Sequence, residues 1–259
     1  GGAAAAGKKA IFFDWDDTLA VRAAGNEREG SQTQEALAIL KDDDKLIEIT
    51  DAPDIYTTVN IINFLADLTS EDNVLWYIVS CGSNRYQYAK LREMAKSEYG
   101  RDINANGEIW FGNAHPESLP YNLYEEDSDQ KIPGGMRCNQ NTKVIGVKRI
   151  MKGIPERNHA GVVVPKVEAI PDPTNTPKYF VDDQQENLDA MNPDTADDTQ
   201  FQNFQTMRVG AGENRRRLRE EDGSALRDSE PEDATFYYTF GLGKTDGPPK
   251  NILTDYRTP

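Results

Sequence analysis

The stretch Lys9-Ala10-Ile11-Phe12-Phe13-Asp14-Trp15-Asp16-Asp17-Thr18 decides the fold of this 259-residue chain. From Ala10 to Phe13 it is continuously apolar, which is typical of a parallel strand that is buried on both faces. The strand ends abruptly at Asp14, where the chain becomes acidic. This change predicts that carboxylates gather where the strand leaves a sheet.

Further segments alternate between the two kinds of regular structure. Short apolar runs predict strands at 75–79, 108–111, 178–181 and 206–209, with an extra strand or hairpin arm at 162–170. Apolar spacing and helix-end signals predict helices at 32–41, 54–68, 85–99, 143–152 and 187–191. The alternation indicates an α/β fold, a Rossmann-like three-layer sandwich around a central, mainly parallel sheet.

The composition suggests how the chain is divided. Residues 1–8 are almost entirely glycine and alanine, and we interpret them as a tag or linker. We expect one domain at 9–210 with small insertions near 20–53 and 112–141. Residues 211–259 are rich in charge, and we expect a segment that is partly disordered or docked on the domain.

Charge, cysteine count and hydropathy restrict partners and compartment. The formal net charge is -15, so the surface repels polyanions and we expect no nucleic-acid partner. Two cysteines are too few for a disulfide framework, and a reducing compartment fits best, although one disulfide stays open. No apolar run approaches the ~20 residues that span a bilayer. We therefore expect a cytoplasmic protein without a membrane span, and the oligomeric state stays open.

Two carboxylates lie two residues apart at the end of the first strand. Such a pair suits the hydrolysis of a phosphate ester. Asp14 can attack the phosphorus of the ester, and Asp16 can protonate the leaving oxygen and later activate water. Thr18 can orient the second carboxylate or contact the substrate. An acidic loop in which Asp17 caps a helix would show the same residues, so this alternative stays open at this point.

Two further segments can bind a phosphoryl group. Ser80 ends a predicted strand, and its hydroxyl can hold a phosphoryl oxygen together with backbone N–H groups of Cys81 and Gly82. Ser80 as a simple helix cap is the alternative. Lys143, at the start of a predicted helix, can neutralise the phosphate, and Lys148 in the same helix is a rival for this role.

A second pair of carboxylates, Asp182 and Asp183, follows the predicted strand 178–181. Parallel strands end at the same edge of a sheet, so this pair is expected to lie near Asp14. Adjacent buried carboxylates repel one another, and a hard cation removes that penalty. Mg2+ accepts carboxylates, waters and substrate phosphate, and the backbone carbonyl of Asp16 can add a ligand. The sequence therefore predicts a magnesium site, against the simpler alternative of an acidic turn.

In this order the motifs resemble those of the haloacid dehalogenase superfamily. The apolar strand followed by DxDxT (Asp14 to Thr18) resembles its first motif, and Val79-Ser80 resembles its second. Lys143 resembles the third motif, and Asp182-Asp183 with Asn187 resembles the fourth. The resemblance covers about residues 9–210.

The resemblance implies a Mg2+-dependent phosphatase that works through an aspartyl-phosphate. Asp14 would be the nucleophile and Asp16 the acid and base. Phosphate would be bound by Ser80 and Lys143, and the metal by Asp14, Asp16, Asp182 and Asp183. An aspartate two residues after the nucleophile resembles phosphatase and phosphotransferase members, not the dehalogenases. The chain departs from the pattern in its loose third motif and its long segment 153–177.

The two expected insertions are smaller than full cap domains, which resembles minimally capped members that act on large substrates. A phosphoprotein is therefore the expected substrate. Phosphotyrosine is one option, as for bacterial effector phosphatases, which work in a host cytosol. The alternatives are a small-metabolite phosphatase or a phosphotransferase. A non-enzymatic interaction module with a remnant site is the alternative from another class.

Overall fold

A five-stranded sheet forms the centre of the described part of the chain. The computed structural model describes residues 8–16, 18–22, 46–51, 54–81, 85–111, 140–159, 162–191 and 204–208. In spatial order the strands are β10 (Phe204–Arg208), β9 (Lys178–Asp182), β1 (Lys9–Phe13), β5 (Val74–Ser80) and β6 (Gly107–Trp110). Each neighbouring pair is parallel.

The apolar run of β1 is explained by its central place, because both of its faces are buried. Successive side chains of a strand point to opposite faces. Ala10 and Phe12 belong to one hydrophobic cluster, and Ile11 and Phe13 belong to another on the opposite face. All four are 0–1% exposed. The four positions from Ala10 to Phe13 are therefore all apolar, and the chain becomes acidic only where it passes the edge of the sheet at Asp14.

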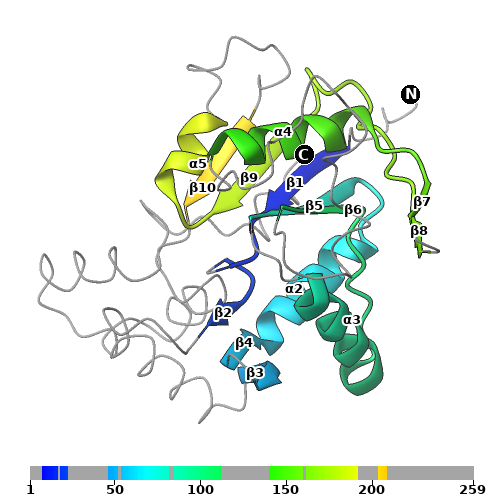
Figure 1. Ribbon diagram of the computed structural model, residues 1–259, viewed down its shortest axis with the longest axis vertical. Coiled ribbons are helices and arrows are strands. Elements are labelled where there is room, and N and C mark those ends of the chain that lie inside the picture. The colour runs from blue at the N-terminus through cyan, green and yellow to red at the C-terminus, as the bar shows by residue number, and fades with distance from the viewer. Residues whose placement is uncertain are drawn as a thin grey trace, which may run out of the picture.

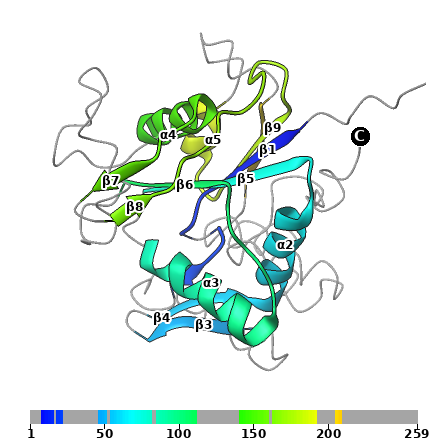
Figure 2. The same cartoon turned by 90° about the vertical axis from the view of Figure 1, so that its right-hand side faces the viewer.

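Helices cover both faces of the sheet, as Figures 1 and 2 show. One face carries α2 (Val59–Ser70) and α3 (Arg85–Tyr99), and the other carries α4 (Gln140–Lys152) and α5 (Gln185–Ala190). The result is a three-layer α/β sandwich with a Rossmann-like parallel sheet, which confirms the predicted fold class.

The strand order reverses beside β1. The chain proceeds from β1 outward through β5 to β6, and then returns to the other side of β1 with β9 and continues to β10. In open α/β sheets, ligands bind beyond the carboxyl ends of the strands where the order reverses. The topology therefore predicts a ligand site at the ends of β1 and β9, where Asp14 and Asp182 lie.

The prediction of a helix at 54–68 is wrong for its first five residues. Residues Asp54–Thr58 form β4, which joins β2 (Val21–Arg22) and β3 (Leu46–Asp51) in an antiparallel sheet. The segment is rich in β-branched and aromatic residues, which favour strands. Thr58 then caps α2, because its side chain accepts a hydrogen bond from Ile61 N at 3.2 Å. The first insertion therefore extends beyond residue 53.

Other boundaries agree with the sequence or shift by a few residues. Helix α3 has the expected bounds and ends at Gly100, whose φ of 61° is a left-handed conformation that suits glycine. Helix α4 begins three residues earlier than expected. The run 162–170 yields only β8 (Val162–Val164), which pairs with β7 (Arg157–His159) in a hairpin. The expected helix at 32–41, most of the insertion 112–141 and the segment 211–259 lie outside the described residues.

Helix α4 approaches the sheet closely at Gly146. A Cβ atom at this position would lie 2.9 Å from Cζ of Phe111 and 3.0 Å from Cγ1 of Val79, which is closer than side chains pack. Glycine therefore sets the distance between α4 and the strands. Lys143 lies one turn earlier on the same helix, so this approach also places its side chain near the ends of the strands.

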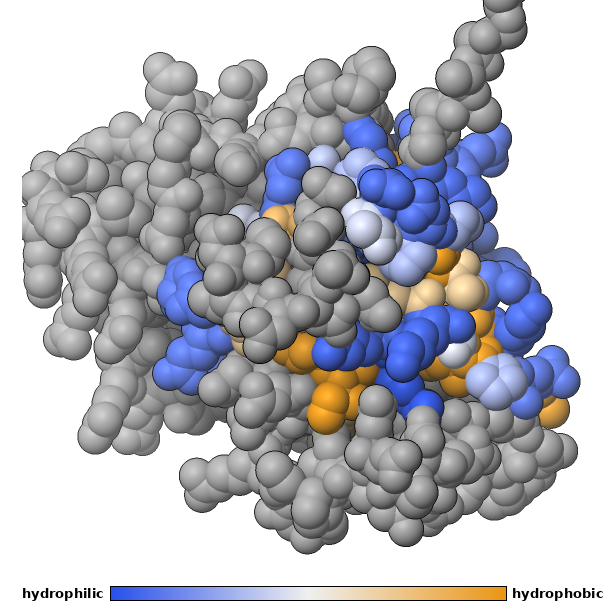
Figure 3. All heavy atoms as spheres, turned by 90° about the horizontal axis from the view of Figure 1, so that it is seen from above, coloured by the Kyte–Doolittle hydropathy of each residue, from blue (hydrophilic) through white to orange (hydrophobic). Residues whose placement is uncertain are grey.

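The described surface is largely polar. In the space-filling view, hydrophilic side chains cover much of the described surface on the face shown, and hydrophobic ones show between them (Figure 3). Among the described residues, the large hydrophobic side chains that are exposed are Tyr86, Tyr99 and Val163. None of the helices within the described ranges has the length and apolarity to cross a membrane.

Candidate active site

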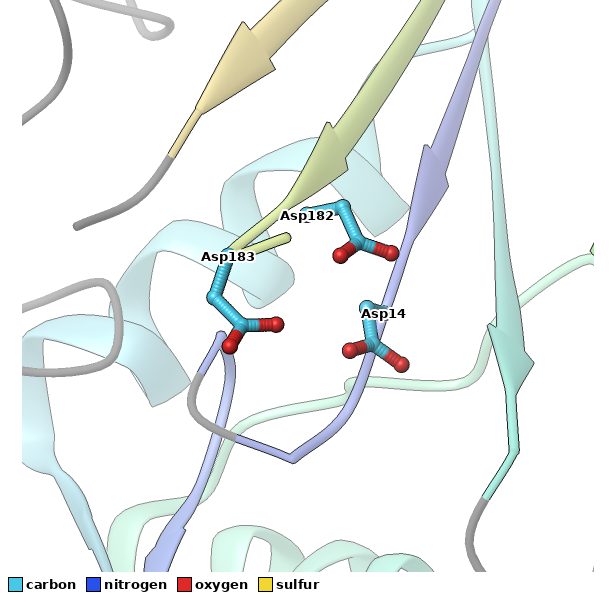
Figure 4. A group of neighbouring side chains, drawn as sticks. All are labelled: Asp14, Asp182 and Asp183. Atoms are coloured by element: carbon cyan, nitrogen blue, oxygen red, sulfur yellow. The ribbon is translucent and has the colours of Figure 1, made fainter. Parts of the chain in front are cut away.

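Three carboxylates converge where β1 and β9 end (Figure 4). Asp14 directly follows β1, and its backbone N–H donates to the carbonyl of Val181 at 2.9 Å. Asp182 is the last residue of β9, and Asp183 follows it. Carboxylate oxygens of the three residues lie within 4.8 Å of one another. The parallel pairing of β1 with β9 thus brings together residues that are 168 or more positions apart in the sequence.

Lys143 bridges two of these carboxylates from α4. Its Nζ lies 2.9 Å from Oδ1 of Asp14 and 2.6 Å from Oδ2 of Asp182. The residues Lys143, Asp14 and Asp182 are 2%, 5% and 0% exposed, so water screens these contacts little. The lysine that contacts the carboxylates is therefore Lys143. Lys148 lies five residues further along α4 and is partly exposed.

Asp182 is held in place by its own loop. Its Oδ1 accepts hydrogen bonds from Nδ2 of Asn187 at 2.9 Å and from the backbone N–H of Gln184 at 2.8 Å. Asn187 lies in α5 and is 4% exposed. With Lys143 on Oδ2, both oxygens of Asp182 are engaged, which fixes the orientation of the carboxylate. The sequence analysis places Asn187 in one motif with Asp182 and Asp183 but gives no sign of the Gln184 contact.

Burial and neighbouring charges control the protonation of the cluster. The pKa of Asp14 is raised from 3.8 to about 7, because burial and, to a smaller extent, the charges of Asp182 and Asp16 together outweigh the opposing effect of Lys143. Burial lowers the pKa of Lys143, but the charges of Asp14 and Asp182 outweigh burial and raise it above its usual range. Lys143 is therefore a permanent cation, whereas Asp14 needs more positive charge to be fully ionised at neutral pH.

Asp16 and Thr18 lie in the loop after Asp14. Asp16 forms a β-bridge with Ala20, is partly exposed, and is close enough to act electrostatically on Asp14. Thr18 is 0% exposed, and its hydroxyl has no hydrogen-bond partner among the residues that the structure describes. Asp16 is thus the one of the two that solvent or substrate can reach.

The expected phosphate-binding segment after β5 is described in part. Ser80 ends β5 next to β1 and is 0% exposed, and its carbonyl accepts a hydrogen bond from the N–H of Phe111 at 2.9 Å. Cys81 is disulfide-bonded, so its thiol is not available to a substrate in this form. Gly82 lies outside the described residues. Ser80 therefore lies at the same edge of the sheet as the end of β1, and its role in phosphate binding stays a prediction.

Trp15 anchors the Asp14 loop from the opposite side, a role that the sequence analysis missed. Its side chain is 0% exposed, and its Nε1 donates to Oε1 of Gln87 in α3 at 2.8 Å. Its ring centroid lies 5.7 Å from those of Tyr88 and Trp110. The alternation of β1 would have revealed this, because Trp15 continues the face of Phe13 while Asp14 continues that of Phe12.

The donor set fits a hard divalent cation. Three carboxylates within 4.8 Å of one another supply oxygen ligands, and Mg2+ prefers oxygen. The pKa of Asp14 stays raised, mainly because of burial, although Lys143 lowers it. A second cation would favour the ionised form of Asp14. Asp14, Asp182 and Asp183 are the residues that would hold it.

Comparison with known proteins yields no relative on which to base an assignment. No family model, no curated protein and no solved structure matches this chain. The case for any function therefore rests on the site itself, a lysine buried between two carboxylates at the point where the strand order of a parallel sheet reverses.

Proposed function

We propose that the chain is a Mg2+-dependent phosphatase of the haloacid dehalogenase type. The observation that carries the proposal is the position of Lys143, whose Nζ contacts both Asp14 and Asp182. A buried lysine beside a carboxylate nucleophile balances the charge of an incoming phosphate. The order of the motifs along the chain supports the same reading.

In the first step, a carboxylate oxygen of Asp14 attacks phosphorus. Lys143 engages Oδ1 of Asp14, so we assign the attack to Oδ2. The bond from phosphorus to the leaving oxygen breaks, and Asp16 supplies the proton that the leaving oxygen needs. The products are an alcohol or phenol and a phosphorylated Asp14. Asp16 is partly exposed, so its carboxyl can reach the leaving group and exchange protons with solvent.

In the second step, a water molecule attacks the phosphorylated Asp14. Asp16, now ionised, accepts a proton from the water, and the bond between phosphorus and the Asp14 oxygen breaks. Inorganic phosphate leaves, and the carboxylate of Asp14 is restored. Trp15 and Gln87 hold the backbone between the two aspartates against α3, which keeps them in register for both steps.

Mg2+, when bound by Asp14, Asp182 and Asp183, would supply positive charge for the phosphoryl oxygens. Asn187 and the N–H of Gln184 orient Asp182 for this role from behind. Such partners of ligand residues typically change metal affinity by about 10–100-fold when they are removed. Ser80 is proposed to hold a phosphoryl oxygen from the neighbouring strand.

For the substrate we propose a phosphate ester on a large molecule, a phosphoprotein with phosphotyrosine among the options. The support comes from the described part of the first insertion, a small antiparallel sheet of β2, β3 and β4. A sheet of this size covers less of a substrate than a full cap domain does. Phosphopeptides assayed beside phosphorylated metabolites distinguish this substrate from a small one.

Hydrolysis of p-nitrophenyl phosphate tests the proposed reaction and its metal. We expect turnover with Mg2+ and loss of turnover when the metal is removed, because the phosphoryl oxygens would then lack the positive charge of the ion and Asp14, with its pKa of about 7, would be less ionised. Mg2+ added back should restore the rate. Unchanged turnover after complete metal removal would rule out a metal-dependent mechanism. No turnover of any phosphate ester with Mg2+ would favour the interaction module.

Asp16→Asn separates the two roles of this residue. As an acid, Asp16 should accelerate the departure of a poor leaving group about 10²–10⁴-fold, whereas p-nitrophenolate leaves without a proton. We expect the variant to react with p-nitrophenyl phosphate, to accumulate phosphorylated Asp14, and to be nearly inert toward alkyl phosphates. Single-turnover kinetics with intact-mass detection measures this. An equal loss for both substrates, with no trapped intermediate, would contradict the role of Asp16.

A further inference from the structure

A pocket lies at the end of α3, where the chain turns back toward β6. Its volume is about 510 Å³, within the range of small-molecule sites. Gly100 turns the chain, and the N–H of Arg101 then donates to the carbonyl of Ala95 at 2.8 Å, which folds the following residues over the helix end. Polar and charged residues line most of the pocket: Arg92, Glu93, Lys96, Arg101, Asp102 and Asn104.

Three cations in this lining form no ion pair with any described carboxylate. Within the part of the chain that the structure describes, no carboxylate oxygen lies within 4.0 Å of the charged groups of Arg92, Lys96 or Arg101. Glu93 and Asp102 are the acidic residues of the lining, so cations outnumber carboxylates there by three to two. The whole chain has the opposite balance, with 44 acidic and 29 basic residues. A local excess of positive charge on such a chain favours an anion.

The guanidinium of Arg92 is already held in place. Its Cζ lies 4.8 Å from the centroid of the Tyr88 ring, and its Nη1 donates to Oδ1 of Asn104 at 3.3 Å. The hydroxyl of Tyr88 in turn donates to the carbonyl of Ile103 at 2.8 Å and accepts from the N–H of Ala105 at 2.8 Å. A guanidinium fixed in this way loses little freedom when it binds an oxyanion.

One of the two carboxylates has a structural task. Oδ1 of Asp102 accepts a hydrogen bond from the N–H of Asn104 at 3.0 Å, which shapes the loop that carries Asn104. Basic residues near a helix end also stabilise the helix dipole, and Lys96 lies in the last turn of α3. That role alone would not require Arg101, which follows the helix, or the arrangement of Tyr88 and Asn104 around Arg92.

The pocket is separate from the proposed active site. Helix α3 starts at Arg85, shortly after Ser80 at the catalytic edge of the sheet, and runs for 15 residues. At 1.5 Å per residue, Arg92 and Lys96 lie about 10 Å and 16 Å along the helix from its start. The lining contains none of the residues of the aspartate cluster, so an anion that these cations bind is not the phosphate that would react at Asp14.

We propose that the pocket at the end of α3 binds a small, multiply charged oxyanion through Arg92, Lys96 and Arg101. The recognised chemistry is that of phosphate or carboxylate groups, carried by a phosphorylated metabolite or a polycarboxylate. The proposal stands apart from the phosphatase reaction, because none of its residues belongs to the aspartate cluster. Its test therefore measures binding and not turnover.

The test is to titrate the whole chain with pyrophosphate and, separately, with citrate. Calorimetry measures the binding, and amide chemical shifts show which residues are affected. Metal should be removed with a chelating resin, because dissolved EDTA is itself a polycarboxylate. We expect saturable binding of at least one probe, with shift changes in residues 92–104. The double variant Lys96→Gln/Arg101→Gln should weaken it, by about tenfold for each charged contact that is lost.

Lys90→Gln is the matched control, because it removes a positive charge from the same helix outside the pocket lining. It should bind the probes as the wild type does. Saturation by pyrophosphate alone would assign the site to phosphate groups, and by citrate alone to carboxylates. Equal binding by the wild type and the double variant overturns the proposal. So does the absence of saturable binding of either probe up to roughly 10 mM, because a specific site of this kind should have a lower Kd.

Discussion

Replacing Asp14 by Asn is expected to lower phosphatase turnover by about 10⁴-fold or more and to leave the protein folded. An amide cannot form the acyl phosphate, and removal of a nucleophile costs enzymes rate factors of about this size. The fold should tolerate the change, because Asn has nearly the shape of Asp. The change also removes a charge whose burial is unfavourable, as the raised pKa of Asp14 indicates. Lys143 keeps its contact with Asp182.

Asp72→Asn makes the same chemical change at an exposed turn before β5, away from the cluster. Its turnover should equal that of the wild type. Steady-state assays should be paired with urea unfolding and with intact mass, because deamidation of the introduced asparagine would regenerate an active enzyme. A folded Asp14→Asn protein with turnover near that of the control would remove the basis for a covalent mechanism on Asp14.

The sequence predicted the centre of the fold well because two independent constraints act there. A strand that is buried on both faces must be continuously apolar, so β1 and β9 are visible as short hydrophobic runs. The rule that parallel strands end at one edge then brings Asp14 and Asp182 together without any coordinates. The three carboxylates whose oxygens lie within 4.8 Å of one another at that edge are the ones that this rule selected.

Residues outside this pattern were less predictable, because their positions depend on contacts that are distant in sequence. The spacing of Ile55 and Val59 suits a helix, yet Ile55 pairs in a sheet with Arg22 and Thr50. Helical spacing places Lys143 and Lys148 about 140° apart around the axis of α4. The choice between them depends on how α4 lies on the sheet, which Gly146 sets through its contacts with other elements.

The same limit applies to the polar partners within the core. The hydrogen bond from Trp15 to Gln87 joins residues 72 positions apart, and nothing near Gln87 in the sequence distinguishes it from a solvated helix residue. The bonds that orient Asp182, in contrast, come from residues two and five positions later, within reach of a local motif. Hydrogen bonds to the site from residues nearby in the sequence can thus be predicted, whereas partners from another layer of the fold, such as Gln87, cannot.

Lys143→Met is expected to destabilise the metal-free protein by about 3–5 kcal/mol, the cost of leaving buried charges without a partner. Both Asp14 and Asp182 lose the cation that lies 2.9 Å and 2.6 Å from them. Methionine has nearly the length of lysine without its charge, so packing should change little. Urea unfolding in metal-free buffer measures the loss. Turnover should also fall, because the incoming phosphate loses its positive neighbour.

Lys152→Met is the control for this change, since Lys152 ends the same helix and is exposed. It should alter the free energy of unfolding by no more than about 0.5 kcal/mol. Equal stability of the two variants would show that the cluster does not depend on the charge of Lys143.

Two additions should recover part of the stability that Lys143→Met loses, and they do so for the same reason. The proposed Mg2+ ion would bind the folded state and add RT ln(1 + [Mg2+]/Kd) to its stability. The variant should gain more from the metal than the wild type does, because Lys143 no longer competes with the ion for the carboxylates. Adding Asp14→Asn to Lys143→Met removes one of the two unbalanced carboxylates. The double variant should therefore be more stable than Lys143→Met. Asp14→Asn should stabilise the Lys143→Met background more than the wild type, and this difference is the coupling between residues 14 and 143 in a double-mutant cycle. Strictly additive effects of the two substitutions would show that their 2.9 Å contact contributes nothing to the folded state.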